Sequence, residues 1–248
     1  MQLFELRDYT AQLLQTQLFK DYCPNGLQVE GRAEVLKIAT AVSASQAVID
    51  AAAAWGADAL LAHHGFFWRN EDAPIVGIKK NRIAKLLQHE MSLLAYHLPL
   101  DAHQQLGNNA ELARLMGWQL VARHGDNNLL NVGELETTRS LANLLVQLSE
   151  KLHRVPQVIA GDGREIRRVA WCTGGAQGYF EQAIAHGVDA YITGEISEQS
   201  FHLAQESGVA FIAAGHHATE QFGIQALGAH LAEKFKLTHQ FFNQDNPI

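Results

Sequence analysis

Apolar residues along the chain switch between helical spacing and short continuous runs. Between residues 3 and 18 they recur every three or four positions, which predicts a helix. The segments 35–45 and 57–64 are short apolar runs, which predict strands on either side of a helix over 45–56. The pattern continues with helices at 77–90 and 108–117 and strands at 91–97 and 118–125. Alternation of this kind predicts an α/β fold with largely parallel sheets and flanking helices.

The second half of the chain repeats this order. It has predicted strands at 164–175, 188–195 and 209–217, and helices at 176–187 and 196–208. The stretch WGADALLAHH, which ends at His64, resembles HGVDAYITGE, which ends at Glu195. In this alignment Asp58 corresponds to Asp189, 131 residues later, and His63 to Gly194. An internal repeat of this size predicts a duplicated unit.

A second pair of segments aligns in the same way. His97 corresponds to His216 and Asp101 to Glu220, both 119 residues later. A His-x-x-x-carboxylate element therefore follows a strand once in each half. We expect two related α/β halves packed around a cleft, 1–125 and 126–248, because residues 124–130 are polar and turn-rich. Alternatively, the last segment, 236–245, docks on the first half.

Composition narrows the class of protein. Apolar residues make up 47% and charged residues 18% of the 248 residues, which is typical of a globular protein. The net charge of −7 makes nucleic acid an unlikely main partner. No apolar run reaches the roughly 18 residues of a membrane span, and the N-terminus lacks a signal-peptide pattern. Only two cysteines occur, so we expect no disulfide framework and a cytoplasmic location.

The chain has 13 histidines, and several follow predicted strands. Parallel α/β sheets bind ligands at the carboxyl ends of their strands. Six side chains are expected there, and if the halves face each other they converge: His63, His64, His97, Asp101, His216 and Glu220. Imidazoles with carboxylates are typical ligands of Zn, Mn, Fe or Ni. Adjacent strand residues point to opposite faces, but a strand that ends at Gly65 lets His63 and His64 fan out, one toward each of two metals.

Other interpretations stay open for these residues. A single histidine near an apolar strand is usually a core or surface residue. The spacing of His216 and Glu220 also fits an ordinary helix start capped by Thr219. Pro99 argues against a helix between His97 and Asp101, so we expect a loop there. His217 has no counterpart of its kind in the repeat.

Three further features have structural and functional interpretations. Gly174 and Gly175 could cradle a phosphate, but a tight turn is the favoured interpretation. Arg69 and the basic segment 79–82 could receive an anionic substrate, but a solvated face is favoured. The aromatic run 66–68 is expected to serve packing or an interface, with base stacking as the alternative.

Several motifs together resemble a known family. They are PNGLQVEG, LLAHHGFFW, HLPLD, TGE and GHHATE, in this order over nearly the whole chain. They are similar to the Nif-three-like family, also called dinuclear metal-centre hexameric proteins or GTP cyclohydrolase type-two homologues. This chain has Gly65 where the family often has proline, and His217 where it often has an aromatic residue.

The resemblance implies a two-domain α/β subunit in a toroidal homohexamer, with two divalent metal ions per subunit facing an internal cavity. It implies that five residues are ligands: His63, His64, Asp101, His216 and Glu220. Glu220 would bridge the two ions, and His97 would lie beside them.

These observations favour a metal-dependent hydrolase that acts on a nucleotide-like or other phosphate-bearing small molecule. His97 is the first candidate for the general acid, and Glu195 is the second. The alternative is a non-catalytic metal-binding assembly or regulatory protein, whose site would have no open coordination position. A third interpretation is a structural metal that holds the halves together.

Overall fold

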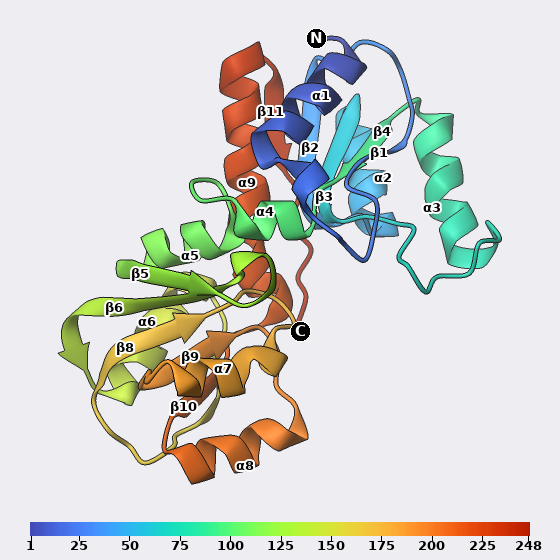
Figure 1. Cartoon of the computed structure of the whole chain (residues 1–248). Coiled ribbons are helices and arrows are strands. Elements are labelled where there is room, and N and C mark those ends of the chain that lie inside the picture. The colour runs from blue at the N-terminus through green and yellow to red at the C-terminus, as the bar shows by residue number, and fades with distance from the viewer. The chain divides into compact units, whose positions relative to one another are not determined.

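The computed structural model describes all 248 residues and divides them into two compact units (Figure 1). The first unit comprises residues 1–107 and 223–245, and the second comprises 108–222 and 246–248. The boundary between the units, at residues 107 and 108, therefore lies N-terminal to the expected boundary near residue 125. The reason is that β5 (Trp118–His124) pairs antiparallel with β6 (Leu130–Arg139) in the second unit's sheet.

The first unit is built on a five-stranded sheet. Its strands lie in the order β1 (Gly26–Val29), β4 (Ser92–Ala95), β3 (Ala59–His64), β2 (Lys37–Ser43) and β11 (Thr238–Phe241). Only the β1–β4 pair is antiparallel. The pairing of β11 with β2 shows that the C-terminal segment joins the first unit, which was the alternative expectation.

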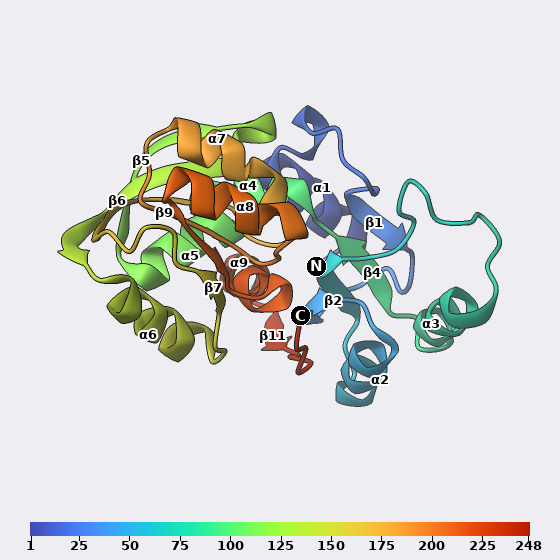
Figure 2. The same cartoon turned by 90° about the horizontal axis from the view of Figure 1, so that it is seen from below.

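Helices cover both faces of this sheet. Helices α1 (Leu3–Leu14) and α9 (His216–Phe235, of which 223–235 belong to this unit) pack on one face. Helices α2 (Gln46–Trp55) and α3 (Gly77–Gln88) pack on the other face. Figure 2 shows α1 on one side of β2 and β4 and α2 on the other. Leu60 and Leu61 point into opposite cores, which is why β3 is apolar without alternation.

Two predicted elements of this unit differ in the structure. The first helix ends at Leu14 rather than at residue 18, because Gln15 adopts a left-handed conformation (φ 51°) and a 3₁₀ turn follows over Thr16–Leu18. The loop expected after His97 is wrong: α4 (Leu98–Ala102) is a short helix there. Pro99 lies in its first turn, where no backbone N–H is needed and proline is tolerated.

The second unit has a six-stranded mixed sheet. Its order is β5, β6, β8 (Ile166–Trp171), β9 (Ala190–Thr193), β10 (Ala210–Ala213) and β7 (Gln157–Ile159). The central strands β8, β9 and β10 are parallel, and every other pair is antiparallel. The prediction of largely parallel sheets is therefore confirmed for the first sheet, but in the second sheet only the three central strands are parallel.

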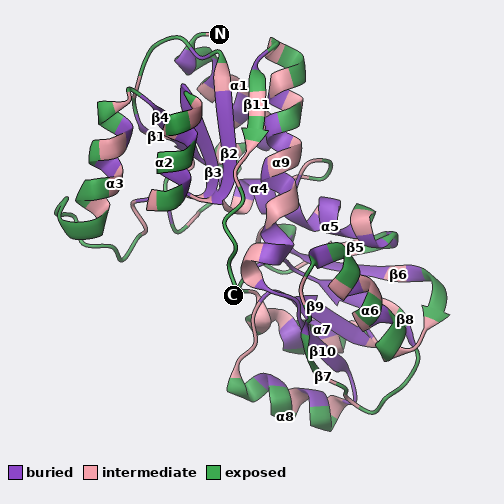
Figure 3. Ribbon diagram, turned by 180° about the vertical axis from the view of Figure 1, so that it is seen from behind, coloured by how far each residue is buried: buried purple, intermediate pink, exposed green.

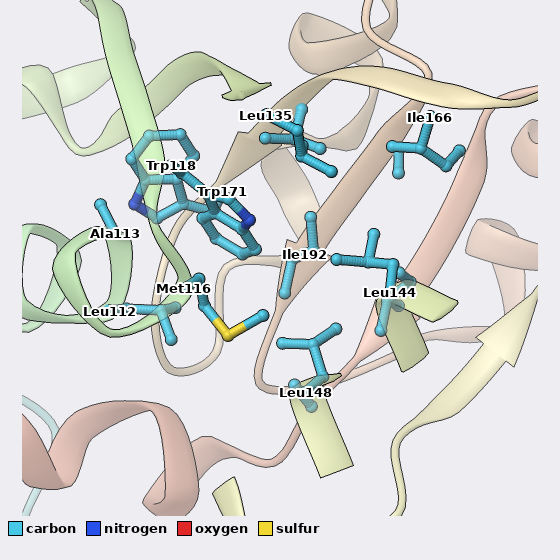
Figure 4. Packing of buried hydrophobic residues seen from close by; sticks show 14 of the residues in the cluster. Leu112, Ala113, Met116, Trp118, Leu135, Leu144, Leu148, Ile166, Trp171 and Ile192 are labelled. Atoms are coloured by element: carbon cyan, nitrogen blue, oxygen red, sulfur yellow. The ribbon is translucent and has the colours of Figure 1, made fainter. Parts of the chain in front are cut away.

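Helices also cover both faces of the second sheet. Helices α5 (Asn108–Met116) and α6 (Leu141–Leu152) pack on one face, where Trp118 and Trp171 lie with ring centroids 5.1 Å apart (Figure 4). Helices α7 (Phe180–Ala185) and α8 (Glu198–Ser207) pack on the other. Figure 3 shows that the central strands are buried. No helix has both the length and the apolar composition needed to cross a lipid bilayer.

The internal repeat is visible in the two sheets. The parallel strands β2, β3 and β4 correspond to β8, β9 and β10. Asp58 accepts hydrogen bonds from the backbone N–H groups of Leu36 and Lys37, both at 2.8 Å. Asp189 binds the N–H groups of Arg167 and Arg168 in the same way, at 2.9 and 2.8 Å. The repeated aspartate therefore ties together two neighbouring parallel strands.

Asp58→Ala and Asp189→Ala should each lower the free energy of unfolding by about 2 kcal/mol, because two charge-assisted bonds to strand backbone are lost. Urea unfolding would measure this, with exposed Asp72→Ala as a control expected to stay within about 0.5 kcal/mol of wild type. Equal stabilities for all three variants would contradict a structural role of the repeated aspartates.

Candidate metal-binding clusters

The first unit gathers four candidate residues at the carboxyl edge of its sheet. β3 ends with His63 and His64, and β4, parallel to it, leads into His97 and then into α4, which carries Asp101. The ring centroid of His63 lies 4.6 Å from that of His64 and 5.1 Å from that of His97. One nitrogen of each of these three rings lies within 4.8 Å of the others, a spacing that can hold a metal ion. We name these four residues the first cluster.

The imidazoles of the first cluster are held through Nδ1. His63 Nδ1 lies 2.9 Å from the backbone oxygen of Tyr96, and His64 Nδ1 lies 3.0 Å from Ser43 Oγ. His63 Nε2 lies 3.5 Å from Asp101 Oδ1. A histidine whose Nδ1 is engaged in this way offers Nε2 as a ligand, and its ring orientation is fixed before a metal binds.

Gly65 is needed directly after the two histidines. A Cβ at this position would overlap the side chain of Gln28 and lie 2.6 Å from the Cβ of Ala95. Gln28 Oε1 also accepts the backbone N–H of Phe66 at 2.7 Å. The glycine therefore lets β1 and β4 approach the end of β3. This close packing is a second reason for glycine at residue 65, besides the backbone freedom expected from the sequence.

His97 is held by a residue that the sequence analysis missed, Asp21. Asp21 Oδ1 lies 2.7 Å from His97 Nδ1, and the carboxylate side chain is only 2% exposed. The same carboxylate accepts the backbone N–H groups of Leu98 at 2.9 Å and Tyr22 at 2.6 Å, and the side-chain amide of Asn25 at 2.9 Å. Its place in the polar loop before Pro24 and Gly26 was the available signal, since such loops often carry functional residues.

The pKa of Asp21 reflects these contacts. Burial alone would raise the pKa of this carboxyl group. The hydrogen bond and the charge of His97, together with the amide of Asn25 and the N–H of Tyr22, outweigh burial and lower the pKa below its ordinary value of 3.8. Asp21 is therefore an anion at neutral pH and holds His97 with Nδ1 as the donor.

The second unit gathers three candidate residues at the carboxyl edge of its parallel strands. Glu195 follows β9, and β10 leads into α9, which begins with His216 and reaches Glu220 one turn later. His216 Nδ1 lies 2.6 Å from Glu195 Oε1, and His216 Nε2 lies 3.1 Å from Glu220 Oε2. Glu220 is buried, with 3% of its surface exposed. We name these three residues the second cluster.

The charge of the second cluster changes the pKa of His216. Burial lowers the pKa, but hydrogen bonds and charges from Glu220 and Glu195 outweigh it and raise the pKa to about 9. The same arrangement suits a cation, because two carboxylates lie on the two ring nitrogens of one imidazole. Glu195 therefore contacts a candidate ligand, where it can orient the ring.

The loop after β8 is a tight turn, which was the favoured interpretation of Gly174 and Gly175. Gly174 has φ +71°, and its N–H is donated to Thr219 Oγ1 at 3.0 Å. Thr193 Oγ1 donates to the backbone oxygen of Gly174 at 3.1 Å. A Cβ on Gly174 would overlap the Glu220 carboxylate, so the glycine is what allows Glu220 to lie against this turn.

The two clusters have a common design. Each unit places a histidine after a strand and a carboxylate four residues later, as the repeat predicts, and in the structure this spacing is one helical turn. In each, a second carboxylate binds Nδ1 of that histidine: Asp21 for His97 and Glu195 for His216. The donor sets fit divalent cations, because oriented imidazoles and carboxylates are the ligands that Zn, Mn, Fe and Ni prefer. The fold and these clusters define an α/β protein with histidine–carboxylate sites suited to such ions.

Comparisons with known proteins agree with this class. The family described as Duf34/NIF3 (NGG1p interacting factor 3) matches residues 1–247. A Neisseria meningitidis serogroup B protein named GTP cyclohydrolase 1 type 2 homolog is 56% identical over 234 residues, which cover 94% of each chain. The Escherichia coli K12 protein of the same name is 46% identical over 244 residues, or 98% of each chain.

A solved structure described as protein ybgI, of unknown function, superposes with a TM-score of 0.97 at 45% identity and covers both chains completely. The chain therefore belongs to the Duf34/NIF3 family, which confirms the resemblance seen in its motifs.

Proposed function

We propose that this chain is a metal-dependent hydrolase of a nucleotide-like or other phosphate-bearing small molecule, with two divalent ions per subunit. The ligands would be those implied by the resemblance: His63, His64, Asp101, His216 and Glu220. The observation that carries the proposal is that the candidate imidazoles are held through Nδ1. The relatives' name, GTP cyclohydrolase 1 type 2 homolog, supports a nucleotide-like substrate.

Bound divalent ions would supply Lewis acidity and lower the pKa of a water molecule, which gives a nucleophile near neutral pH. The chain would supply orientation and proton transfer. Asp21 holds His97 in one tautomer, with Nδ1 protonated and Nε2 able to accept or return a proton. His97 is thus the first candidate for general acid–base catalysis. Glu195, the second candidate, is placed to orient His216.

The first test is the metal content of the purified protein, measured by mass spectrometry of the elements after dialysis. We expect about two ions per subunit, and Glu220→Ala should lose at least one of them. Glu198→Ala is the matched control, because Glu198 also pairs with a histidine one turn away, His202 at 3.1 Å, but on the exposed face of α8. Unchanged metal content in Glu220→Ala would refute the proposed ligand set.

The second test is turnover by the metal-loaded protein on nucleotides, phosphoesters and esters. If the wild-type protein hydrolyses a substrate and His97→Gln abolishes this activity without changing the metal content, His97 is supported as the general acid–base. Full metal content without turnover on any class would favour the alternative, a metal-binding assembly or regulatory protein.

The homohexamer implied by the resemblance belongs to the same proposal. Light scattering should then give a mass about six times the 27.3 kDa of one chain. A mass of one chain would exclude it.

A further inference from the structure

Two aromatic side chains of the first unit, Tyr22 and Trp68, lie beside the ring of His97, and Arg69 lies over the ring of Tyr22. The Trp68 ring meets the His97 ring edge-on, with centroids 5.1 Å apart, and lies 6.0 Å from the ring of His64. The Tyr22 ring lies 6.4 Å from His97 on a second side. Tyr22 is 57% exposed, and Arg69 is exposed as well. We call these three residues the His97 wall.

The wall joins two segments that are distant in the sequence. The backbone N–H of Arg69 donates to the backbone oxygen of Tyr22 at 2.7 Å, and Arg69 Nη2 donates to the backbone oxygen of Asp21 at 2.8 Å. The Arg69 guanidinium also lies over the Tyr22 ring, 5.3 Å from its centroid. The same loop that fixes His97 through Asp21 therefore also fixes an exposed aromatic ring and a cation beside it.

The turn that carries Trp68 is held in an uncommon conformation. Phe67 has φ +64°, which a bulky side chain rarely adopts. Glu71 Oε2 compensates by accepting the N–H of Phe67 at 2.8 Å and that of Trp68 at 3.2 Å. Lys79 of α3 lies 3.5 Å from the other oxygen of Glu71. Such strain persists where the surroundings hold it, and it concentrates at ligand sites.

We propose that the His97 wall is a subsite for a nucleoside phosphate. Its base would stack on an aromatic face of Tyr22 or Trp68, and its phosphate would pair with Arg69. Aromatic faces bind planar bases of any identity, and a guanidinium matches the geometry of phosphate oxygens. A single cation with two rings suits one nucleotide, and the net charge of −7 disfavours a nucleic acid polymer.

This inference deepens the proposed function, since it names the part of the substrate that would lie next to His97. A bound nucleoside would also cover the exposed ring of Tyr22. The packing role expected for the aromatic run 66–68 holds for Phe66, which is 4% exposed. Tyr22 lies outside that run and keeps more than half of its surface open.

The test is calorimetric binding of three probes to the intact metal-loaded protein: guanosine 5′-monophosphate, guanosine and ribose 5-phosphate. Tyr22→Leu and Trp68→Leu should weaken the two base-containing probes about five- to a hundredfold and leave ribose 5-phosphate unchanged. Arg69→Gln should weaken the two phosphate-containing probes and leave guanosine unchanged. Tyr22→Phe and Trp68→Phe should retain binding, because they keep an aromatic face.

Phe4 and Arg7 provide a matched control. They form another aromatic–arginine pair, on α1, in which Phe4 is exposed and Arg7 is half-buried, with the guanidinium 4.7 Å from the ring centroid. Phe4→Leu and Arg7→Gln should change no probe's affinity. If the variants at Tyr22, Trp68 and Arg69 bound every probe with wild-type affinity, the proposed subsite would be wrong. A change of oligomer mass in Tyr22→Leu with nucleotide affinity intact would also overturn it, because Tyr22 would then be an interface residue.

The outcomes also separate this inference from the proposed function. If the probes follow the expected pattern but no substrate is hydrolysed, the subsite stands and the hydrolase proposal fails. If a compound without an aromatic ring is hydrolysed and guanosine 5′-monophosphate does not bind, the subsite fails alone.

Discussion

Asp21→Ala should lower the free energy of unfolding by about 4 kcal/mol, because the variant leaves several donors, most of them part-buried, without their acceptor. The carboxylate binds His97 Nδ1, the Asn25 amide and the N–H groups of Tyr22 and Leu98. It therefore joins the loop before β1 to the start of α4. Urea denaturation would measure the loss.

Asp21→Asn keeps the shape of the side chain but removes its charge and turns one acceptor into a donor. We expect a smaller loss, about 2 kcal/mol, together with a change at His97. With the carboxylate, Nδ1 of His97 carries the proton; an amide can donate to Nδ1 and shift the proton to Nε2. The ¹⁵N chemical shifts of the His97 ring would report this change of tautomer independently of any activity.

The effect of Asp21 should depend on pH in a defined direction. Its pKa is lowered in the folded protein, so the stability it contributes is present above its ordinary pKa of 3.8 and is lost as pH falls through the lower folded value. The difference between wild type and Asp21→Asn should therefore be full at about pH 7 and shrink below about pH 4. Asp50→Asn, on an exposed side chain, is the control. A difference that grows toward acid pH would contradict the assigned ionisation.

The candidate residues could be found from the sequence because their signals are local. Apolar runs mark β3 and β10, and polar residues follow them at once, so His63, His64 and His216 are expected at a carboxyl edge. The repeat adds Asp101 and Glu220, since both lie four residues after the corresponding histidine. The structure places these residues in the two clusters, and their role as ligands stays a prediction.

The remaining features depend on contacts between distant segments. Asp21 is adjacent to His97 only because the loop before β1 returns to the end of β4, 76 residues later in the chain. The mixed second sheet depends on β6 and β7, whose antiparallel pairings no periodicity reveals. Pro99 was misjudged for a different reason: the rule against proline holds for a helix interior, and this helix begins one residue before it.

Gly174→Ala should strongly destabilise the second unit. Its φ of +71° costs any L-residue about 1–2 kcal/mol. The added Cβ would also overlap the Glu220 carboxylate and lie 3.3 Å from His216 Nε2. Glu220 is buried and has little room to move, so we expect a total loss of about 4 kcal/mol and a displaced second cluster. Thermal unfolding and metal content would measure the two consequences.

Variants of two other glycines of the same unit separate the cost of the left-handed backbone from the cost of the overlap with Glu220. Gly187 has φ +67° with no atom within 4 Å of a Cβ, so Gly187→Ala should lose only the conformational part, about 1 kcal/mol. Gly178 has an open surrounding and no left-handed φ, so Gly178→Ala should leave stability nearly unchanged. Both controls should keep wild-type metal content. Gly174→Ala could instead match Gly187→Ala in stability and metal content. The close approach of Glu220 to Gly174 would then contribute nothing to stability, and the second cluster would not need a glycine at residue 174.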